Sequence, residues 1–168
     1  MKIFHGVAEL TASVGTHLGH SNWIDVDQAR VNMFADATDD HQWIHIDPER
    51  AVQGPFGSTI AHGYLTLSLM SEMMWQAYRV DGLAMQINYG CNKVRFPAPV
   101  PVPSRLRAGV ELASVEPFRD GYLSTVVVAV EREGGSKPVC VAEILTYLMP
   151  VTAIDEDVTQ PEVEIANE

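Results

Sequence analysis

The 168-residue sequence has few cysteines and no long apolar run. Its two cysteines, Cys91 and Cys140, lie far apart within apolar sequence, so we expect buried thiols rather than a disulfide or a catalytic thiol. No run approaches the roughly 18 apolar residues that a membrane-spanning helix needs. The first ten residues, MKIFHGVAEL, contain one lysine and no sustained apolar core, which argues against a secretory signal. The sequence therefore predicts a cytoplasmic protein that does not enter a membrane.

Positive charge is also scarce. Eleven Lys and Arg residues stand against 22 Asp and Glu residues, for a formal net charge of −11. Nucleic-acid binding needs clustered cations, so this balance argues against a nucleic-acid partner. Residues 151–168 hold six of the acids and no Lys or Arg, and we expect them to form a disordered tail after a single domain of residues 1–150.

Four of the eleven basic residues gather in one short region of the chain. These residues are Lys93, Arg95, Arg105 and Arg107. They are either solvated residues at strand edges or a site for an anionic ligand. Composition alone does not decide between the two.

Helices are expected in the first half of the chain and strands in the second. Asp25 or Asp27 can cap a helix over residues 28–37. From Tyr64 to Tyr78 the chain lacks glycine and proline and is apolar almost all round, which predicts a helix buried on most sides. Period-two alternation then predicts about four consecutive antiparallel strands joined by tight turns, over residues 83–96, 105–116, 122–133 and 138–149. An antiparallel sheet wrapped round one long helix, an α+β fold, would account for this pattern.

A dense group of ionisable side chains precedes the buried helix. Within it, Asp40 and His45 are five residues apart, about 140° round a regular helix, so only a turn or an overhanging loop would bring them together. Such a pair could act in acid–base catalysis. Alternatively, His41 and His45 have the spacing of two zinc ligands on a helix, although Gln42 replaces the acid that usually follows the first histidine. Solvated surface histidines are the third interpretation.

Gly63 stands where the buried helix is expected to begin. The start of a helix leaves backbone N–H groups free and carries partial positive charge, which suits a developing oxyanion. The alternative is a glycine needed only for a turn or for close packing, and spacing alone favours that alternative.

The segment 34–51 resembles the signature of the MaoC-like, or hydratase 2, family of (R)-specific enoyl-CoA hydratases. Asp40 matches the catalytic Asp of that signature, His45 its catalytic His and Ala51 its small residue. The Ala-His-Gly of residues 61–63 is similar to the family's His-Gly at the start of its central helix, and NKVRFPAPVP to its strand leading into a Pro-Val segment. The resemblance spans about residues 20 to 148.

The chain departs from the signature at three positions. Asp39 replaces its glycine, Gln42 its asparagine and Trp43 its proline. Asp tolerates left-handed backbone better than most residues, and Gln keeps the amide of Asn on a longer stem. We therefore expect the loop to be retained, with Gln42 available to the substrate.

The resemblance implies a hot-dog fold and a homodimer whose acyl tunnel lies near the subunit interface. It implies that Asp40 and His45 activate a water that adds to C3 of a trans-2-enoyl thioester and deliver a proton to C2, while the N–H of Gly63 holds the thioester oxygen. No cofactor or metal is implied.

Further substrate contacts are implied at three positions. Ser71 matches a serine that faces the site in the family, although it could equally be a small residue that packs the helix. Lys93 and Arg95 are expected on one face of their strand, where they could meet the phosphates of CoA.

Two other classes of function remain open. One is another hot-dog enzyme, either a thioesterase or an acyl-carrier-protein 3-hydroxyacyl dehydratase. The other is a non-catalytic acyl-CoA-binding subunit, although the presence of both Asp40 and His45 argues against it.

Overall fold

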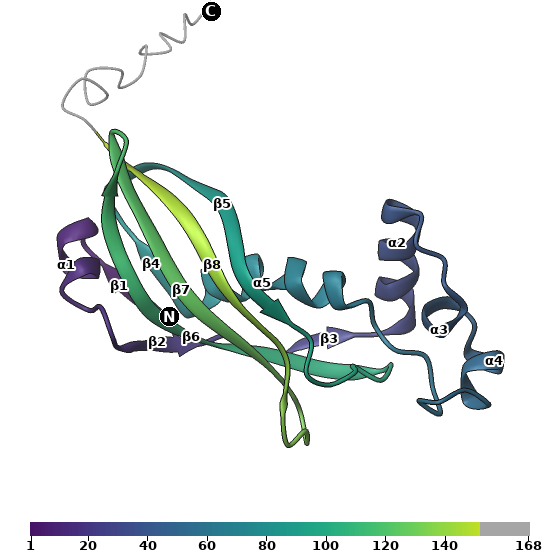
Figure 1. Ribbon diagram of the computed structural model, residues 1–168. Coiled ribbons are helices and arrows are strands. Elements are labelled where there is room, and N and C mark those ends of the chain that lie inside the picture. Colours follow the sequence, from purple (N-terminus) through teal and green to yellow (C-terminus); the bar gives the residue numbers. More distant parts are fainter. Residues whose placement is uncertain (152–168) are drawn as a thin grey trace, which may run out of the picture.

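The computed structural model describes residues 1–151 (Figure 1). The predicted acidic tail, residues 151–168, lies outside the described residues except for Val151. A disordered tail should contribute little to the core, and this stays a prediction, which truncation after Pro150 and a measured Tm would test. None of the described helices is long and apolar enough to cross a membrane. The cytoplasmic location also stays a prediction.

The chain begins with short segments, continues with helices and ends mostly with long strands. The N-terminal segments are β1 (Lys2–Phe4), α1 (Val7–Thr11), β2 (His17–His20) and β3 (Ile24–Val26). The helices that follow are α2 (Gln28–Thr38), α3 (Trp43–Ile46), α4 (Pro48–Val52) and α5 (Gly63–Ala77). The remaining strands are β4 (Tyr78–Val80), β5 (Leu83–Arg95), β6 (Ser104–Phe118), β7 (Gly121–Arg132) and β8 (Pro138–Pro150). These bounds agree closely with the predicted helices and long strands.

The main sheet is antiparallel and has the order β2-β6-β7-β8-β5, with β3 also paired to β6. Strands β6, β7 and β8 are neighbours, as predicted. The expectation that all four long strands follow one another through tight turns is wrong, because β5 pairs with β8 and not with β6. The proline-rich connection after β5 therefore leads the chain from the β5 edge of the sheet, past the positions of β8 and β7, to the position of β6. A separate parallel pair joins β1 to β4.

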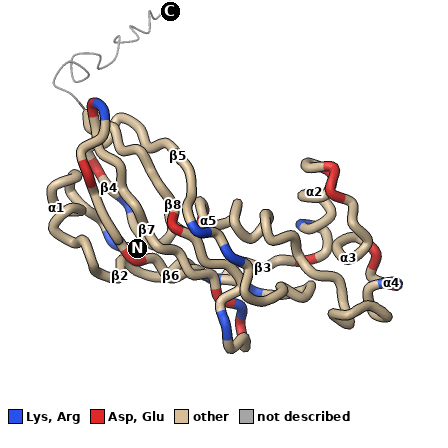
Figure 2. The backbone as a smooth tube through the Cα atoms, viewed as in Figure 1, with Lys and Arg blue, Asp and Glu red and all other residues tan. Residues whose placement is uncertain are grey.

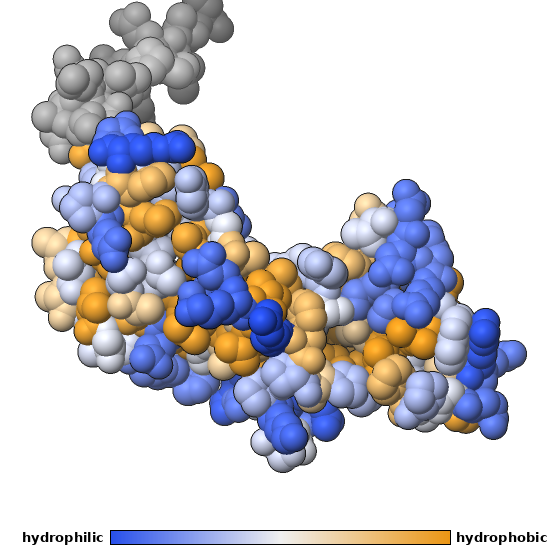
Figure 3. Space-filling model, viewed as in Figure 1, coloured by the Kyte–Doolittle hydropathy of each residue, from blue (hydrophilic) through white to orange (hydrophobic). Residues whose placement is uncertain are grey.

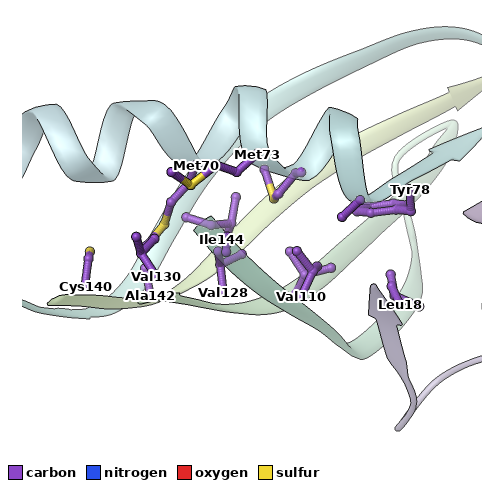
Figure 4. Close-up of a cluster of buried hydrophobic side chains, with 14 of the residues drawn as sticks. Leu18, Met70, Met73, Tyr78, Val110, Val128, Val130, Cys140, Ala142 and Ile144 are labelled. Atoms are coloured by element: carbon purple, nitrogen blue, oxygen red, sulfur yellow. The ribbon is translucent and has the colours of Figure 1, made fainter. Parts of the chain in front are cut away.

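Helix α5 packs across the curved sheet, as the pattern of the sequence predicted (Figure 1). Met70 and Met73 point from the helix toward valines of the strands (Figure 4). From Ser124 to Val130 on β7 every second side chain is buried, including Val126, Val128 and Val130. Burying a side chain of this size contributes about 1.5–3 kcal/mol, so this face of the sheet is the main source of stability.

The two cysteines differ in environment. Cys140 is buried in the core, and desolvation raises the pKa of its thiol to about 11. Cys91 is exposed on β5, so the expectation of a buried thiol is wrong at that position. Strand β5, which carries Cys91, lies at the edge of the sheet and pairs with one described strand, whereas β8, which carries Cys140, pairs with a strand on each side.

Helix α5 is less buried than predicted. Leu65, Met70 and Met73 are buried, but Tyr64 is 69% exposed and Trp75 is 52% exposed. Its first turns extend beyond the sheet toward α2, α3 and α4 (Figure 1). One chain therefore covers only one side of the helix. The three short helices form an overhang, residues 28–52, beyond the end of the sheet.

Candidate active site

The turn after α2 brings Asp40 to the site. Asp27 caps the helix, since its carboxylate accepts a hydrogen bond from the N–H of Arg30 at 2.8 Å. The helix ends where Asp39 adopts a left-handed conformation with φ 58°. Aspartate is one of the few residues that enter this region at small cost, so Asp39 fulfils the role expected of the glycine that it replaces. The chain reverses there, and Asp40 follows outside the helix.

The short helix α3 then places His45 in the interior. His45 is 7% exposed, and its Nδ1 lies 2.6 Å from the carbonyl oxygen of Ile60. A carbonyl can only accept, so Nδ1 carries the hydrogen and donates it. The lone pair of the neutral ring is then on Nε2. Asp40 thus lies before a turn and His45 after it, and the turn brings the two side chains together, as the spacing argument required.

Three side chains meet at this turn. A carboxylate oxygen of Asp40 and one nitrogen each of His45 and His62 lie within 4.8 Å of one another. The rings of His45 and His62 are stacked, with centroids 3.8 Å apart and planes at 26°. We call these residues the Asp40–His45–His62 cluster. Asp40 is exposed and the two histidines are buried, so water reaches the cluster from the Asp40 side.

Burial controls the protonation of His45. Desolvation lowers the pKa of its imidazole below the ordinary 6.5, and the neighbouring His62 lowers it further. The hydrogen bond to Ile60 and the charge of Asp40 act in the opposite direction without reversing the shift. His45 is therefore neutral at pH 7 and can accept a proton on Nε2.

A cavity of about 310 Å³ adjoins the cluster. It is lined by His45 and Gly63 and by apolar groups that include Phe56, Phe96 and Val100. Gly63 is the first residue of α5, so its N–H is among those that the helix leaves unpaired. A Cβ added at Gly63 would lie 3.1 Å from the Phe96 ring. Glycine is thus also needed for packing, which agrees with the alternative raised by the sequence.

The zinc pair suggested by the spacing of His41 and His45 does not form. His41 is exposed and bonds to Asp36 at 2.9 Å, whereas His45 faces the interior. Among the described residues, the Asp40–His45–His62 cluster is the group that could hold a metal ion. Its donors fit poorly, because the Nε2 of His62 lies 2.9 Å from the carbonyl oxygen of Asp40 and must carry a hydrogen. That nitrogen cannot be a ligand in this arrangement.

Two of the predicted substrate-binding residues lie apart from the cavity. Ser71 is eight residues beyond Gly63, about 12 Å along the helix. Its hydroxyl accepts a hydrogen bond from Asn88 Nδ2 at 3.2 Å, and it borders two other cavities between α5 and β5. Gln42 is the exposed N-cap residue of α3, and its side chain makes no capping bond. Its role in substrate binding stays a prediction.

Most of the basic group is neutralised by acids. Ion pairs join Lys93 to Glu143 at 2.6 Å, Arg105 to Asp25 and Glu133, and Arg107 to Glu131. Blue and red segments accordingly adjoin on the sheet (Figure 2). These pairs favour the interpretation as strand-edge residues over an anion site.

The predicted common face of Lys93 and Arg95 is not secured by strand geometry. Lys93 has φ 50°, and the register shifts between Asn92 and Arg95, so the alternation on which that prediction rested is interrupted. Arg95 bonds to the carbonyl of Val94 and directly precedes Phe96, which lines the cavity. Of the two basic residues, Arg95 is therefore the one that is next in the sequence to a residue lining the cavity.

Sequence reasoning missed the packing role of two residues. His62 was placed only as the partner of Gly63 in a motif, yet it is 2% exposed and contacts both Asp40 and His45. Phe96 covers Gly63 and lines the cavity. No periodic pattern in the sequence marks either residue. The position of His62 directly before the first glycine of a buried helix could have indicated that it lies in the site.

Comparison with known proteins identifies the family of the chain. A model of the MaoC like domain matches residues 9–134. The 3-hydroxyacyl-thioester dehydratase Z of Mycobacterium tuberculosis (strain H37Rv) is 56% identical over 150 residues, which are 88% of this chain and 99% of that protein. Nodulation protein N of Rhizobium leguminosarum is 43% identical over 146 residues, 84% of this chain and 90% of that protein.

A solved structure extends the likeness to the fold. The (R)-hydratase from A. caviae superposes with a TM-score of 0.64 at 26% identity, covering 80% of this chain and 98% of the hydratase. The hot-dog fold predicted from the sequence is thereby confirmed. The chain belongs to the MaoC-like dehydratase family and is an enzyme of its hydratase and dehydratase class.

Proposed function

We propose that this enzyme catalyses the reversible hydration of trans-2-enoyl-CoA to (R)-3-hydroxyacyl-CoA, with Asp40 and His45 as the acid–base pair. The observation that carries the proposal is the meeting of an exposed carboxylate and a buried neutral imidazole beside an apolar cavity. Gly63, the first residue of α5, whose N–H the helix itself leaves unpaired, lines the same cavity. The proposed hydration of an enoyl thioester uses these three features together.

The chemistry uses one water and two positioned groups. Two polar atoms within 4.8 Å of each other can both bond to a single bridging water. Nε2 of His45 has a free lone pair and can take a proton from that water as the water oxygen bonds to C3. The π electrons of C2=C3 move to C2, which takes up the proton that the Asp40–His45 pair removed from the water, so the pair returns to its starting protonation state. Dehydration is the same sequence reversed.

Charge develops on the thioester oxygen as C3 is attacked. The N–H of Gly63 at the start of α5 is suited to stabilise that charge, because helix N-termini present free donors and partial positive charge. The mostly apolar cavity wall suits an acyl chain. The name of the relative from M. tuberculosis supports a thioester substrate and the dehydration direction.

Two alternatives are kept. An acyl-carrier-protein dehydratase differs only in the carrier, and basic residues that are already paired with acids do not favour CoA over the carrier. Comparing CoA-linked with carrier-linked 3-hydroxyacyl substrates separates these two. Assays with saturated acyl-CoA test for a thioesterase. A non-catalytic acyl-CoA-binding subunit would turn over none of these substrates.

The first prediction tests the acid–base pair. General acid–base groups each contribute about 10² to 10⁴ in rate, so Asp40→Asn and His45→Gln should each lose most of kcat while staying folded. The double variant should lose much less than the product of the two effects, because groups that act together are non-additive. Steady-state hydration of enoyl-CoAs of several chain lengths, with chiral analysis of the product, measures this.

Matched controls lie four residues away from each target. Asp36→Asn and His41→Gln remove the same chemical groups from an exposed hydrogen-bonded pair outside the cavity, and both should retain activity. Wild-type-like hydration by either folded target variant, or a purely (S) product from the unmodified enzyme, would refute the assignment.

We also propose that the enzyme is a homodimer. Strand β5 pairs only with β8 among the described strands, and Met85, Ile87 and Tyr89 on it are 50%, 40% and 47% exposed. Hydrophobic side chains lie at the surface over the sheet and along the hollow between the sheet and α2 (Figure 3). A second copy would cover both the free edge and the exposed side of α5.

A further inference from the structure

His62 is buried, polar and unused by the mechanism above. It is 2% exposed, and its Nδ1 is the buried side-chain polar atom without a hydrogen-bond partner among the described residues. Buried polar atoms without partners are rare in native proteins, so such a residue is retained for a reason other than stability. Its environment indicates what that reason is.

The ring of His62 touches each segment that contributes to the site. Its Nε2 donates to the carbonyl oxygen of Asp40 at 2.9 Å and lies 3.9 Å from the Asp40 carboxylate. One face of the ring stacks on His45, and the ring also contacts Phe34 of α2, with centroids 5.1 Å apart. In the chain, His62 directly precedes Gly63. One side chain therefore links the turn after α2, helix α3 and the start of α5.

We propose that His62 is a positioning residue, which holds Asp40, His45 and the Gly63 N–H in register through one hydrogen bond and one stacked ring. The hydrogen bond fixes the backbone of Asp40, and the stack fixes the ring plane of His45. The two rings carry their hydrogens on different nitrogens, Nδ1 in His45 and Nε2 in His62, because each donates to a carbonyl. This inference rests on the proposed function for its kinetic part only.

The stack also affects the acid–base chemistry. The titratable groups that face the two rings are Asp40, from the turn, and each imidazole for the other, while Phe34 adds no charge. His62 is one cause of the lowered pKa of His45. Replacement of His62 by leucine, which keeps this part of the site apolar, should therefore move the acidic limb of the pH–rate profile to higher pH.

Three variants separate the parts of this role. His62→Gln keeps an amide N–H near the position of Nε2 but loses the ring. His62→Leu loses both the donor and the ring. Val128→Ala removes buried apolar volume from β7, at a residue that does not line the cavity, and controls for a general loss of stability.

We expect His62→Leu to lower kcat by about ten- to a hundredfold, the cost of slight misplacement of reacting groups, with KM changed much less. His62→Gln should retain more of kcat than His62→Leu, and Val128→Ala should keep the wild-type kcat and pH profile. Wild-type kcat and an unmoved acidic limb in folded His62→Leu would overturn the proposal. If His62→Leu fails to fold, the same two measurements on His62→Gln decide.

Nitrogen-15 NMR of the imidazoles gives a readout that is independent of activity. We expect the hydrogen of His62 on Nε2 and that of His45 on Nδ1 in the wild-type enzyme. A hydrogen on Nδ1 of His62 would overturn the proposal even if the kinetics agreed. If the enzyme hydrated no enoyl thioester, the proposed function would fail, while the NMR result would still decide the positioning of the rings.

Discussion

The protonation of His45 is set by where its ring lies. Desolvation lowers its pKa below 6.5, whereas the hydrogen bond to Asp36 raises the pKa of the nearby exposed His41 above 6.5. Two histidines four residues apart therefore shift in opposite directions. The neutral form of His45 carries the lone pair that the proposed reaction needs.

This difference leads to a pH prediction. On acidification His41 should become protonated first, above pH 6.5, and His45 should become protonated below pH 6.5. The acidic limb of kcat/KM should follow His45. The unfolded chain binds a proton at His45 more readily than the folded one, so the stability that neutral His45 contributes should be lost as pH falls below 6.5. NMR titration of both Cε1–H signals measures the order, and a His45 midpoint above that of His41 would contradict it.

The contact between Gly63 and Phe96 gives a second prediction at this scale. Gly63→Ala keeps the backbone N–H but places its Cβ 3.1 Å from the ring of Phe96, which lines the cavity, so the ring must shift by a few tenths of an ångström. We expect kcat/KM to fall by about tenfold or more, because small misplacements at a reacting centre are costly. Adding Phe96→Leu should restore part of the loss by making room.

The two outcomes of this pair have different meanings. Recovery in the double variant assigns the need for glycine to packing. A loss that Phe96→Leu does not relieve would show that Ala disturbs the helix start itself. Phe96→Leu alone serves as the control for the change in cavity shape.

At the scale of elements, strand β5 is the part that one chain leaves uncovered. Met85, Ile87 and Tyr89 on it are exposed, and its outer edge pairs with no described strand. We expect Ile87→Asp to weaken the proposed dimer, because burying an unpaired charge at an interface is unfavourable. Light scattering at micromolar concentration measures the mass.

The control places the same charge elsewhere. Val14 is 42% exposed in the α1–β2 connection, so Val14→Asp should leave the mass unchanged. A monomeric wild-type enzyme under these conditions would refute the homodimer. Loss of activity with loss of the dimer would link the interface to the site.

Local rules were sufficient to predict several elements. The helix cap at one of two aspartates, which proved to be Asp27, the apolar helix after Gly63 and the left-handed tolerance of Asp39 each depend on a few adjacent residues. The meeting of Asp40 with His45 required only that the chain turn between them. The family resemblance then pointed to the correct turn.

Long-range pairing was not predictable from the same rules. Whether β5 pairs with β6 or β8 depends on the path of a proline-rich connection, which alternation does not encode. The environment of Lys93 depends on a register shift in β5 and on Glu143 of β8. The stacking of His62 on His45 joins segments 17 residues apart, and no local pattern marks it.

At the scale of the whole molecule, sheet and site are built differently. Strand β7 is paired on both sides along its length, by β6 and β8. The overhang, residues 28–52, has short helices that contact mainly one another. It is joined to the rest through Val31, which packs into the core, and through a few hydrogen bonds, among them those from the Ile60 N–H to the Ile44 carbonyl and from the Thr59 hydroxyl to Gln28.

The overhang should therefore open on its own, at a lower free energy than global unfolding. Amide hydrogens of α2 and α3 should exchange with deuterium faster than those of β7, and low denaturant should abolish turnover before the core melts. Equal protection in both regions would contradict this. Because Asp40 and His45 both lie in the overhang, the enzyme would be inactivated by a local and reversible opening while its hydrophobic core stays intact.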